Sequence, residues 1–203
     1  MSFSALIQRA TAIRSRALIA GAALLMLAGC AGKTAQTNHY MLPSNAPQQQ
    51  YANSLAVAVA PIRLTGLLDN PGIVMQLNDI EVYQARQHLW AEDIGVQLQQ
   101  QLQQQLSASL PQAHIAAKGQ PLQTGLAQRE VRVSINAFQG SYNGNAVVQG
   151  QWQVLGADGQ LLQHKNFRIE QPLSEDGYPT LVRTLGAAWD QVSQELAAAL
   201  AAD

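Results

Sequence analysis

The chain contains one cysteine, Cys30, and its thiol is the most reactive side chain that the sequence offers. A single cysteine cannot form a disulfide within the chain, and it cannot build a cysteine-based metal site. The residues that precede it are small or aliphatic and read Leu27-Ala28-Gly29. Small residues of this kind are typical of the cleavage site of a secretory signal. The sequence therefore places its one thiol directly after a predicted signal cleavage site.

Residues 1–29 have the composition of a secretory signal peptide. Arg9, Arg14 and Arg16 give a basic start without acidic residues, and an apolar run begins at Ala17. This run of about a dozen residues is shorter than the ~20 residues that cross a bilayer as a helix. We predict that the segment is cleaved; an uncleaved membrane anchor is the alternative.

The tetrad Leu27 to Cys30 resembles a bacterial lipobox. In a lipobox the thiol receives a diacylglyceryl group and the cysteine becomes the new N-terminus, so the resemblance implies diacylglycerol and an N-acyl lipid on Cys30. Two or more acyl chains hold a protein firmly at a membrane, whereas one does so only marginally. Residue 31 is Ala rather than Asp, and by the same resemblance this favours the periplasmic face of the outer membrane.

The charge of the chain argues against a nucleic-acid-binding protein. Cleavage before Cys30 would leave 174 residues, in which 9 basic residues face 13 acidic residues, for a net charge of -4. Charged residues make up 12% of the whole chain, about half the usual quarter. Nucleic-acid binders normally carry a clustered basic face. Apolar residues at 47% are sufficient for a core, and 28 glutamines predict a polar, weakly charged surface.

No other motif in the sequence indicates catalysis or a cofactor. There is no nucleophile elbow, phosphate loop or dinucleotide motif. The adjacent carboxylates Glu92-Asp93 and Glu175-Asp176 lie at the starts of predicted helices, where they complement the helix dipole. A metal site assembled in three dimensions and an anchored hydrolase are alternatives to a non-enzymatic protein without cofactor or metal. The histidines show no ligand spacing on a helix: His39, His88, His114 and His164.

The composition divides the chain into three parts. We predict a signal peptide over residues 1–29, an acylated N-terminus and flexible tether over 30–54, and one folded domain over 55–203. Residues 31–54 are small, polar and rich in Gln, a composition that does not bury enough surface to order itself. The apolar cluster His39-Tyr40-Met41-Leu42-Pro43 lies within this tether. It either docks on the domain or belongs to a loose linker.

Hydrophobic periodicity predicts the element order β-ββ-α-β-β-β-β-α for the domain. One helix is expected from about Asp93 to Leu110 and a second from about Tyr178 to Ala202, each with an apolar stripe. Two amphipathic helices on one face of a mixed, mostly antiparallel sheet make an α+β two-layer sandwich. The expected strands cover residues 55–62, 73–77, 80–85, 114–117, 131–137, 148–154 and 161–169.

A turn between two of these strands is the most unusual internal stretch. It reads Phe138-Gln139-Gly140-Ser141-Tyr142-Asn143-Gly144. Tyr and Asn among glycines suit an adaptable contact surface, although an ordinary hairpin with Tyr packed on the sheet is the alternative. Together with the tether cluster, this stretch supplies the candidate partner-binding residues, which are Tyr40, Leu42, Phe138 and Tyr142.

The ordered set of motifs resembles the PqiC family of ABC-type transport auxiliary lipoproteins. After the lipobox, the matching stretches are Tyr40-Met41-Leu42-Pro43, Leu89-Trp90-Ala91, Phe138-x-Gly140-x-Tyr142-x-Gly144 followed by Gly150-x-Trp152, and Asp176-Gly177-Tyr178 with Trp189. They run through nearly all of the mature chain. Residue 39 departs from the pattern, because it is His where family members often have an aromatic residue. The helix around Gln104 is also unusually uncharged.

The resemblance implies a non-enzymatic subunit of an MCE-type intermembrane lipid transport system. Such an outer-membrane lipoprotein docks a periplasm-spanning MCE tunnel onto the outer membrane and supports membrane integrity. The implied partners are an MCE-domain protein similar to PqiB and further copies of the chain in a ring. The resemblance supplies Cys30 as the acylated residue and no catalytic residue. A periplasmic lipid-binding carrier lipoprotein is the alternative function.

Overall fold

Alternating apolar residues on three long strands build the centre of the fold. In the computed structural model, which describes residues 36–202, these strands are β7 (Ala127–Gly140), β8 (Asn145–Gly156) and β9 (Leu161–Pro172). They form an antiparallel meander. Val131, Val133 and Ile135 point into the core, while the intervening Arg132 and Ser134 lie on the outer face. This period of two is what a half-buried strand requires.

Six shorter strands extend the meander into one mixed sheet of nine strands. The β4–β5 hairpin is antiparallel, as predicted, and the remaining pairings are parallel. The predicted α+β sandwich is therefore confirmed, with the two longest ladders antiparallel. The added strands are β1 (Asn38–Tyr40), β2 (Leu55–Val59), β3 (Arg63–Leu64), β4 (Gly72–Gln76), β5 (Val82–Trp90) and β6 (His114–Ala117).

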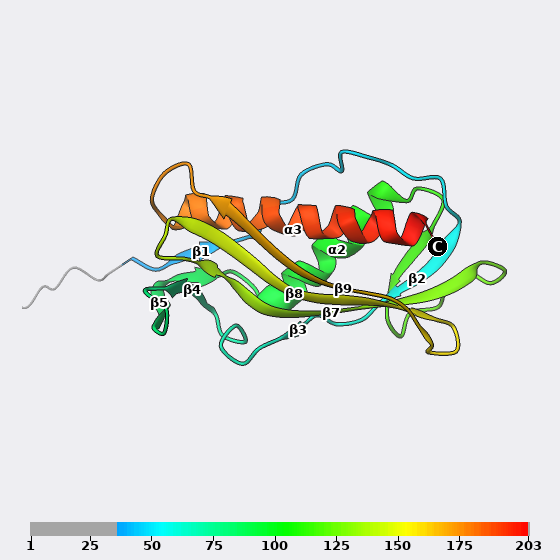
Figure 1. The fold of residues 1–203 in the computed structure, drawn as a ribbon, viewed down its shortest axis with the longest axis horizontal. Coiled ribbons are helices and arrows are strands. Elements are labelled where there is room, and N and C mark those ends of the chain that lie inside the picture. Colours follow the sequence, from blue (N-terminus) through cyan, green and yellow to red (C-terminus); the bar gives the residue numbers. More distant parts are fainter. Residues whose placement is uncertain (1–35, 203) are drawn as a thin grey trace, which may run out of the picture. The chain divides into compact units, whose positions relative to one another are not determined.

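The two helices pack against each other and against the sheet (Figure 1). Helix α2 (Ile94–Ser109) begins at Asp93, whose carboxylate accepts a hydrogen bond of 3.0 Å from the Val96 N–H. Helix α3 (Tyr178–Ala201) begins after Gly177 and has Pro in its first turn, where a missing N–H costs nothing. The predicted leucine stripe of α2 is fully buried. Among residues 36–202, neither helix is long and apolar enough to cross a membrane.

The folded unit begins earlier than the domain boundary predicted at residue 55. It starts at Thr37, and residues 38–45, which we call the strap, are fixed to it. Strand β1 lies parallel to β5, and Leu42 is only 5% exposed. Further along, the Tyr51 N–H donates to the Ser109 carbonyl at 2.7 Å. Of the two readings of the apolar cluster at residues 39–43, the structure shows the docked one, and residues 37–54 belong to the folded unit.

Glutamines of α2 hold the strap through its backbone. Gln97, Gln101 and Gln105 follow one another at helical spacing, and all three are buried although we predicted glutamine on the surface of this helix. The Leu42 N–H donates to Gln97 Oε1 at 2.8 Å, and the Gln101 amide donates to the Leu42 carbonyl. An amide side chain has both a donor and an acceptor, so it satisfies an extended backbone without introducing charge.

A buried carboxylate on α3 completes the attachment of the strap. Asp190 is 4% exposed and accepts four hydrogen bonds, which a buried charge needs. The donors are Ser44 Oγ at 3.0 Å, the Asn45 N–H at 2.9 Å, Asn45 Nδ2 at 2.9 Å and Gln105 Nε2 at 2.8 Å. One turn earlier, Gly186 leaves room for the strap, because a Cβ there would lie 2.5 Å from the Pro43 carbonyl oxygen.

Gly186→Ala tests whether the strap is bound as described. Helix propensity alone predicts that this change stabilises α3 by about 1 kcal/mol. The contact with Pro43 predicts destabilisation instead, because the added Cβ forces the strap to move away from α3. We expect lower stability in urea unfolding and faster hydrogen exchange at the Leu42 and Asn45 amides. Gln191→Ala, on the exposed side of the same helix, is the control and leaves strap exchange unchanged. A stabilised Gly186→Ala protein with protected strap amides contradicts the assignment.

Candidate docking surface

Segments that are distant in the sequence meet at one end of the sheet. Because β4 runs parallel to β7, the β4–β5 hairpin tip and the β7–β8 turn lie at the same end. The chain leaving β9 joins them, since the Leu173 N–H donates to the Gly144 carbonyl at 2.9 Å. Figure 1 shows this end opposite the β8–β9 turn. We call residues 77–83, 141–144 and 173–178 the hairpin end.

Large apolar side chains are exposed at the hairpin end. Ile80 is 89% exposed and Tyr142 is 61% exposed. Five of the ten exposed large apolar side chains among the described residues lie here, namely Leu77, Ile80, Val82, Tyr83 and Tyr142. Single exposed apolar residues are normal on a protein surface, but a group at one end indicates a contact site.

A cleft of about 350 Å³ opens beside Tyr142. Its apolar wall comes from Met75, Leu173, Tyr178 and Leu181. The Gly140-x-Tyr142-x-Gly144 spacing follows from this geometry. A Cβ on Gly140 would meet the Met75 sulfur and the Leu181 side chain, while Gly144 turns the chain with a φ of +82° that favours glycine. Tyr142 is thus displayed beside the cleft by two glycines.

Three stacked rings join β1, β5 and α3 at the base of this region. The His88 and Tyr178 rings stack with centroids 3.9 Å apart, and the Tyr40 ring also stacks with His88, at 5.8 Å. The Tyr40 hydroxyl is 2.8 Å from His88 Nδ1. Burial raises the pKa of the Tyr178 phenol, and the neighbouring Tyr83 and Tyr40 raise it further, so Tyr178 carries no phenolate at neutral pH. The stack fixes the strap relative to the first turn of α3.

The four predicted partner-binding residues have different surroundings. Tyr142 is exposed and Tyr40 is half-buried in the ring stack. Leu42 and Phe138 lie in the core, at 5% and 2% exposed, so their placement on a contact surface is corrected. Phe138 points inward and packs against Trp90, with ring centroids 5.9 Å apart. The predicted lipobox residues Leu27, Ala28, Gly29 and Cys30 lie outside the described residues.

Sequence reasoning did not identify the hairpin tip as part of the surface. The predicted β4–β5 hairpin is confirmed, but Ile80, predicted in the strand over residues 80–85, lies in the turn, because β5 begins at Val82. The sequence does mark the exposed tip. Ile80 lies between Asp79 and Glu81, two residues after Asn78, and apolar residues are uncommon in such a turn. Within residues 36–202, no group of three His, Cys, Asp or Glu side chains is placed to hold a metal ion.

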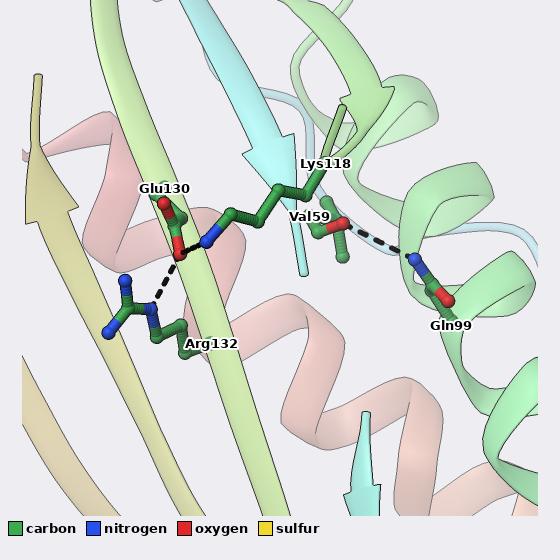
Figure 2. Close-up of polar contacts among 5 residues, drawn as sticks. All are labelled: Val59, Gln99, Lys118, Glu130 and Arg132. Carbon is green, nitrogen blue, oxygen red and sulfur yellow. Dashed lines mark hydrogen bonds and ion pairs between the residues drawn. The ribbon is translucent and has the colours of Figure 1, made fainter. Parts of the chain in front are cut away.

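A second hollow, of about 440 Å³, lies on the outer face of the sheet and is lined by Arg63, Lys118 and Arg132. Figure 2 shows Glu130 between two of these cations, with Lys118 Nζ at 2.8 Å and Arg132 Nε at 2.5 Å from its carboxylate. Burial alone would raise the pKa of Glu130, but the hydrogen bonds from Arg132 and Lys118 outweigh it and lower that pKa. Because Lys118 and Arg132 are already paired, this hollow is a weaker candidate than the hairpin end.

Glu130→Gln is expected to lower the free energy of unfolding by less than about 1 kcal/mol at neutral pH, the usual range for partly exposed ion pairs. Because the folded-state pKa of Glu130 is lowered, the stabilisation is present above the ordinary glutamate pKa of about 4.3 and disappears as the pH falls through the folded value. Urea unfolding from pH 7 to pH 3 measures this. Glu92→Gln is the control. If the difference in unfolding free energy between wild type and Glu130→Gln grows as the pH falls, the pairing of Glu130 with Arg132 and Lys118 is contradicted.

Sequence comparison gives matches along most of the chain. Intermembrane transport lipoprotein PqiC of Escherichia coli K12 is 33% identical over 178 residues, which cover 86% of this chain and 92% of the relative. The protein of the same name from Shigella flexneri matches equally. Both names describe a transport lipoprotein rather than an enzyme.

Two solved structures share the fold. The crystal structure of an uncharacterized protein superposes with a TM-score of 0.70 at 28% identity, covering 81% of this chain and 99% of its own. A protein from Xanthomonas campestris gives a TM-score of 0.66 at 15% identity, covering 79% and 92%. The second likeness shows the fold alone.

The sequence profile of the ABC-type transport auxiliary lipoprotein component matches residues 40–197, from the strap to the last turns of α3. The chain therefore belongs to the family of ABC-type transport auxiliary lipoproteins.

Proposed function

We propose that this chain is a lipid-anchored, non-catalytic subunit of an MCE-type intermembrane lipid transport system. Acylated at Cys30, it is held on the periplasmic face of the outer membrane and docks the MCE tunnel there as a ring of copies. The observation that carries the proposal is the 33% identity over 178 residues to a protein named for intermembrane transport. The family match over residues 40–197 and the lipobox support it independently.

The strap gives this proposal a geometric consequence. Because residues 38–45 are bound to α2 and α3, only the chain between Cys30 and Asn38 separates the acylated residue from the folded unit. Eight residues span at most about 27 Å when fully extended. The predicted tether of 25 residues would have reached about three times as far. A short connection keeps the domain close to its membrane, which suits a docking subunit better than a carrier that must leave it.

Cys30→Ala is expected to abolish acylation, since no other thiol is available. The chain should keep its signal peptide or be lost from the outer-membrane fraction, whereas the wild-type mature N-terminus carries the mass of the added acyl groups. Intact-mass spectrometry and membrane fractionation measure both effects. Thr34→Ala is the control and should be processed normally. A mature wild-type chain without acyl mass contradicts the anchor.

Purification of the lipidated chain from detergent-solubilised membranes tests the partner. We expect an MCE-domain protein to co-purify, and the assembly to have a mass several times that of one chain. A tagged lipoprotein of another family, expressed in the same cells, is the control. If chemical crosslinking captures no MCE-domain protein, the docking role is wrong. Stoichiometric phospholipid bound to a solitary chain would instead favour the lipid carrier.

A further inference from the structure

We propose that the hairpin end rests on the lipid bilayer in which the chain is anchored, with Ile80 and Tyr142 at the boundary between headgroups and acyl chains. This inference rests on the proposed acylation of Cys30. It assigns the exposed apolar side chains of the hairpin end to lipid rather than to the transport partner.

The direction of β1 relates the N-terminal end of the folded unit to the hairpin end. Asn38 pairs with His88 and Tyr40 with Trp90, so β1 runs parallel to β5. Followed backwards from Asn38, the chain therefore heads toward Val82 and the hairpin tip. The stretch of β5 from His88 to Val82 is about 20 Å long. The eight residues from Asn38 to Cys30 span at most about 27 Å, which exceeds this length, so the tip lies within reach of the acylated cysteine.

The side chains at this end suit a bilayer interface. Ile80 is almost fully exposed at the tip, with Leu77 and Val82 beside it. Tyr142 has an apolar ring and a polar hydroxyl, the combination that favours the headgroup level. Elements lying at the interface bury their apolar face about 5–10 Å into this boundary. The hairpin end therefore offers a shallow apolar contact beside the anchor.

Three backbone amides of the tip already have hydrogen bonds, which matters because an unsatisfied amide is costly where water is scarce. The Ile80 and Glu81 N–H groups donate to Asn78 Oδ1 at 3.0 and 2.8 Å. The Leu77 N–H donates to the Glu81 carbonyl at 2.8 Å. These three hydrogen bonds lower the cost of placing the tip in the interface.

The charge of the tip predicts which lipids it prefers. Asp79 and Glu81 flank Ile80, and both are exposed. Two carboxylates beside the inserted residue are repelled by anionic lipids. Contact should thus be stronger on zwitterionic than on anionic bilayers, the opposite of a basic membrane-binding surface.

A single-thiol label tests the contact in the full acylated chain. Because Cys30 is blocked by its lipid, Tyr142→Cys introduces one free thiol, to which the polarity-sensitive fluorophore NBD is attached. The protein is reconstituted into phosphatidylcholine vesicles, and flotation confirms anchoring. We expect several-fold brighter, blue-shifted emission and quenching by brominated lipid tails. Leu161→Cys is the matched control, because Leu161 is 52% exposed beside the β8–β9 turn and should give no response.

Two further arms separate the possible outcomes. Adding Ile80→Asp to the labelled Tyr142→Cys chain should cut the response severalfold while flotation persists, and adding phosphatidylglycerol to the vesicles should weaken it. An anchored chain whose label stays as in water overturns the inference and leaves the proposed function intact. A label that responds only when MCE-domain protein is added also overturns it, in favour of a protein contact at Tyr142. A chain that does not float overturns the acylation and this inference together.

Discussion

The buried carboxylate of Asp190 is the interaction on which the arrangement of the N-terminal part depends. Among residues 36–202 it pairs with no cationic side chain and is held instead by four neutral donors, three of them from the strap. Burying a charge in this way is costly unless every donor is in place. The strap must therefore lie on α2 and α3 in one register, and that register fixes β1 on the edge of β5. The register of β1 thus depends on a carboxylate that lies 145 residues after Asn45 in the sequence.

Local patterns were sufficient for most of the fold. The leucine spacing of α2 and the alternation in β7 and β8 each have a single physical explanation, so these elements follow from the sequence. The strap could not be predicted in this way. Its order comes from the side chains of Gln97, Gln101 and Gln105, and glutamine at these positions is equally suited to solvent. Only the contact with the strap determines whether these glutamines are buried or exposed to solvent.

The candidate surface likewise has some residues that local sequence patterns predict and others that only the tertiary structure places. Tyr142 was identifiable because Gly140 and Gly144 frame it, and each glycine has a steric reason that leaves a trace in the sequence. Phe138 belongs to the same motif but faces the core, because the strand alternates and a bulge lies between Ile135 and Ala137. The motif therefore predicts where the turn lies in the fold, but it does not predict which of its side chains are exposed. The aromatic stack around His88 needs three elements and has no local signature.

The parallel pairing of β1 with β5 also determines how the domain resists force. A pull on the chain before Asn38 acts along the axis of β1, so the hydrogen bonds to β5 share the load in shear rather than opening one after another. Behind them, the contacts of the strap with Gln97, Gln105 and Asp190 must break before the pull reaches the core. The strap thus transmits a pull on the N-terminal part of the chain to both helices as well as to the sheet.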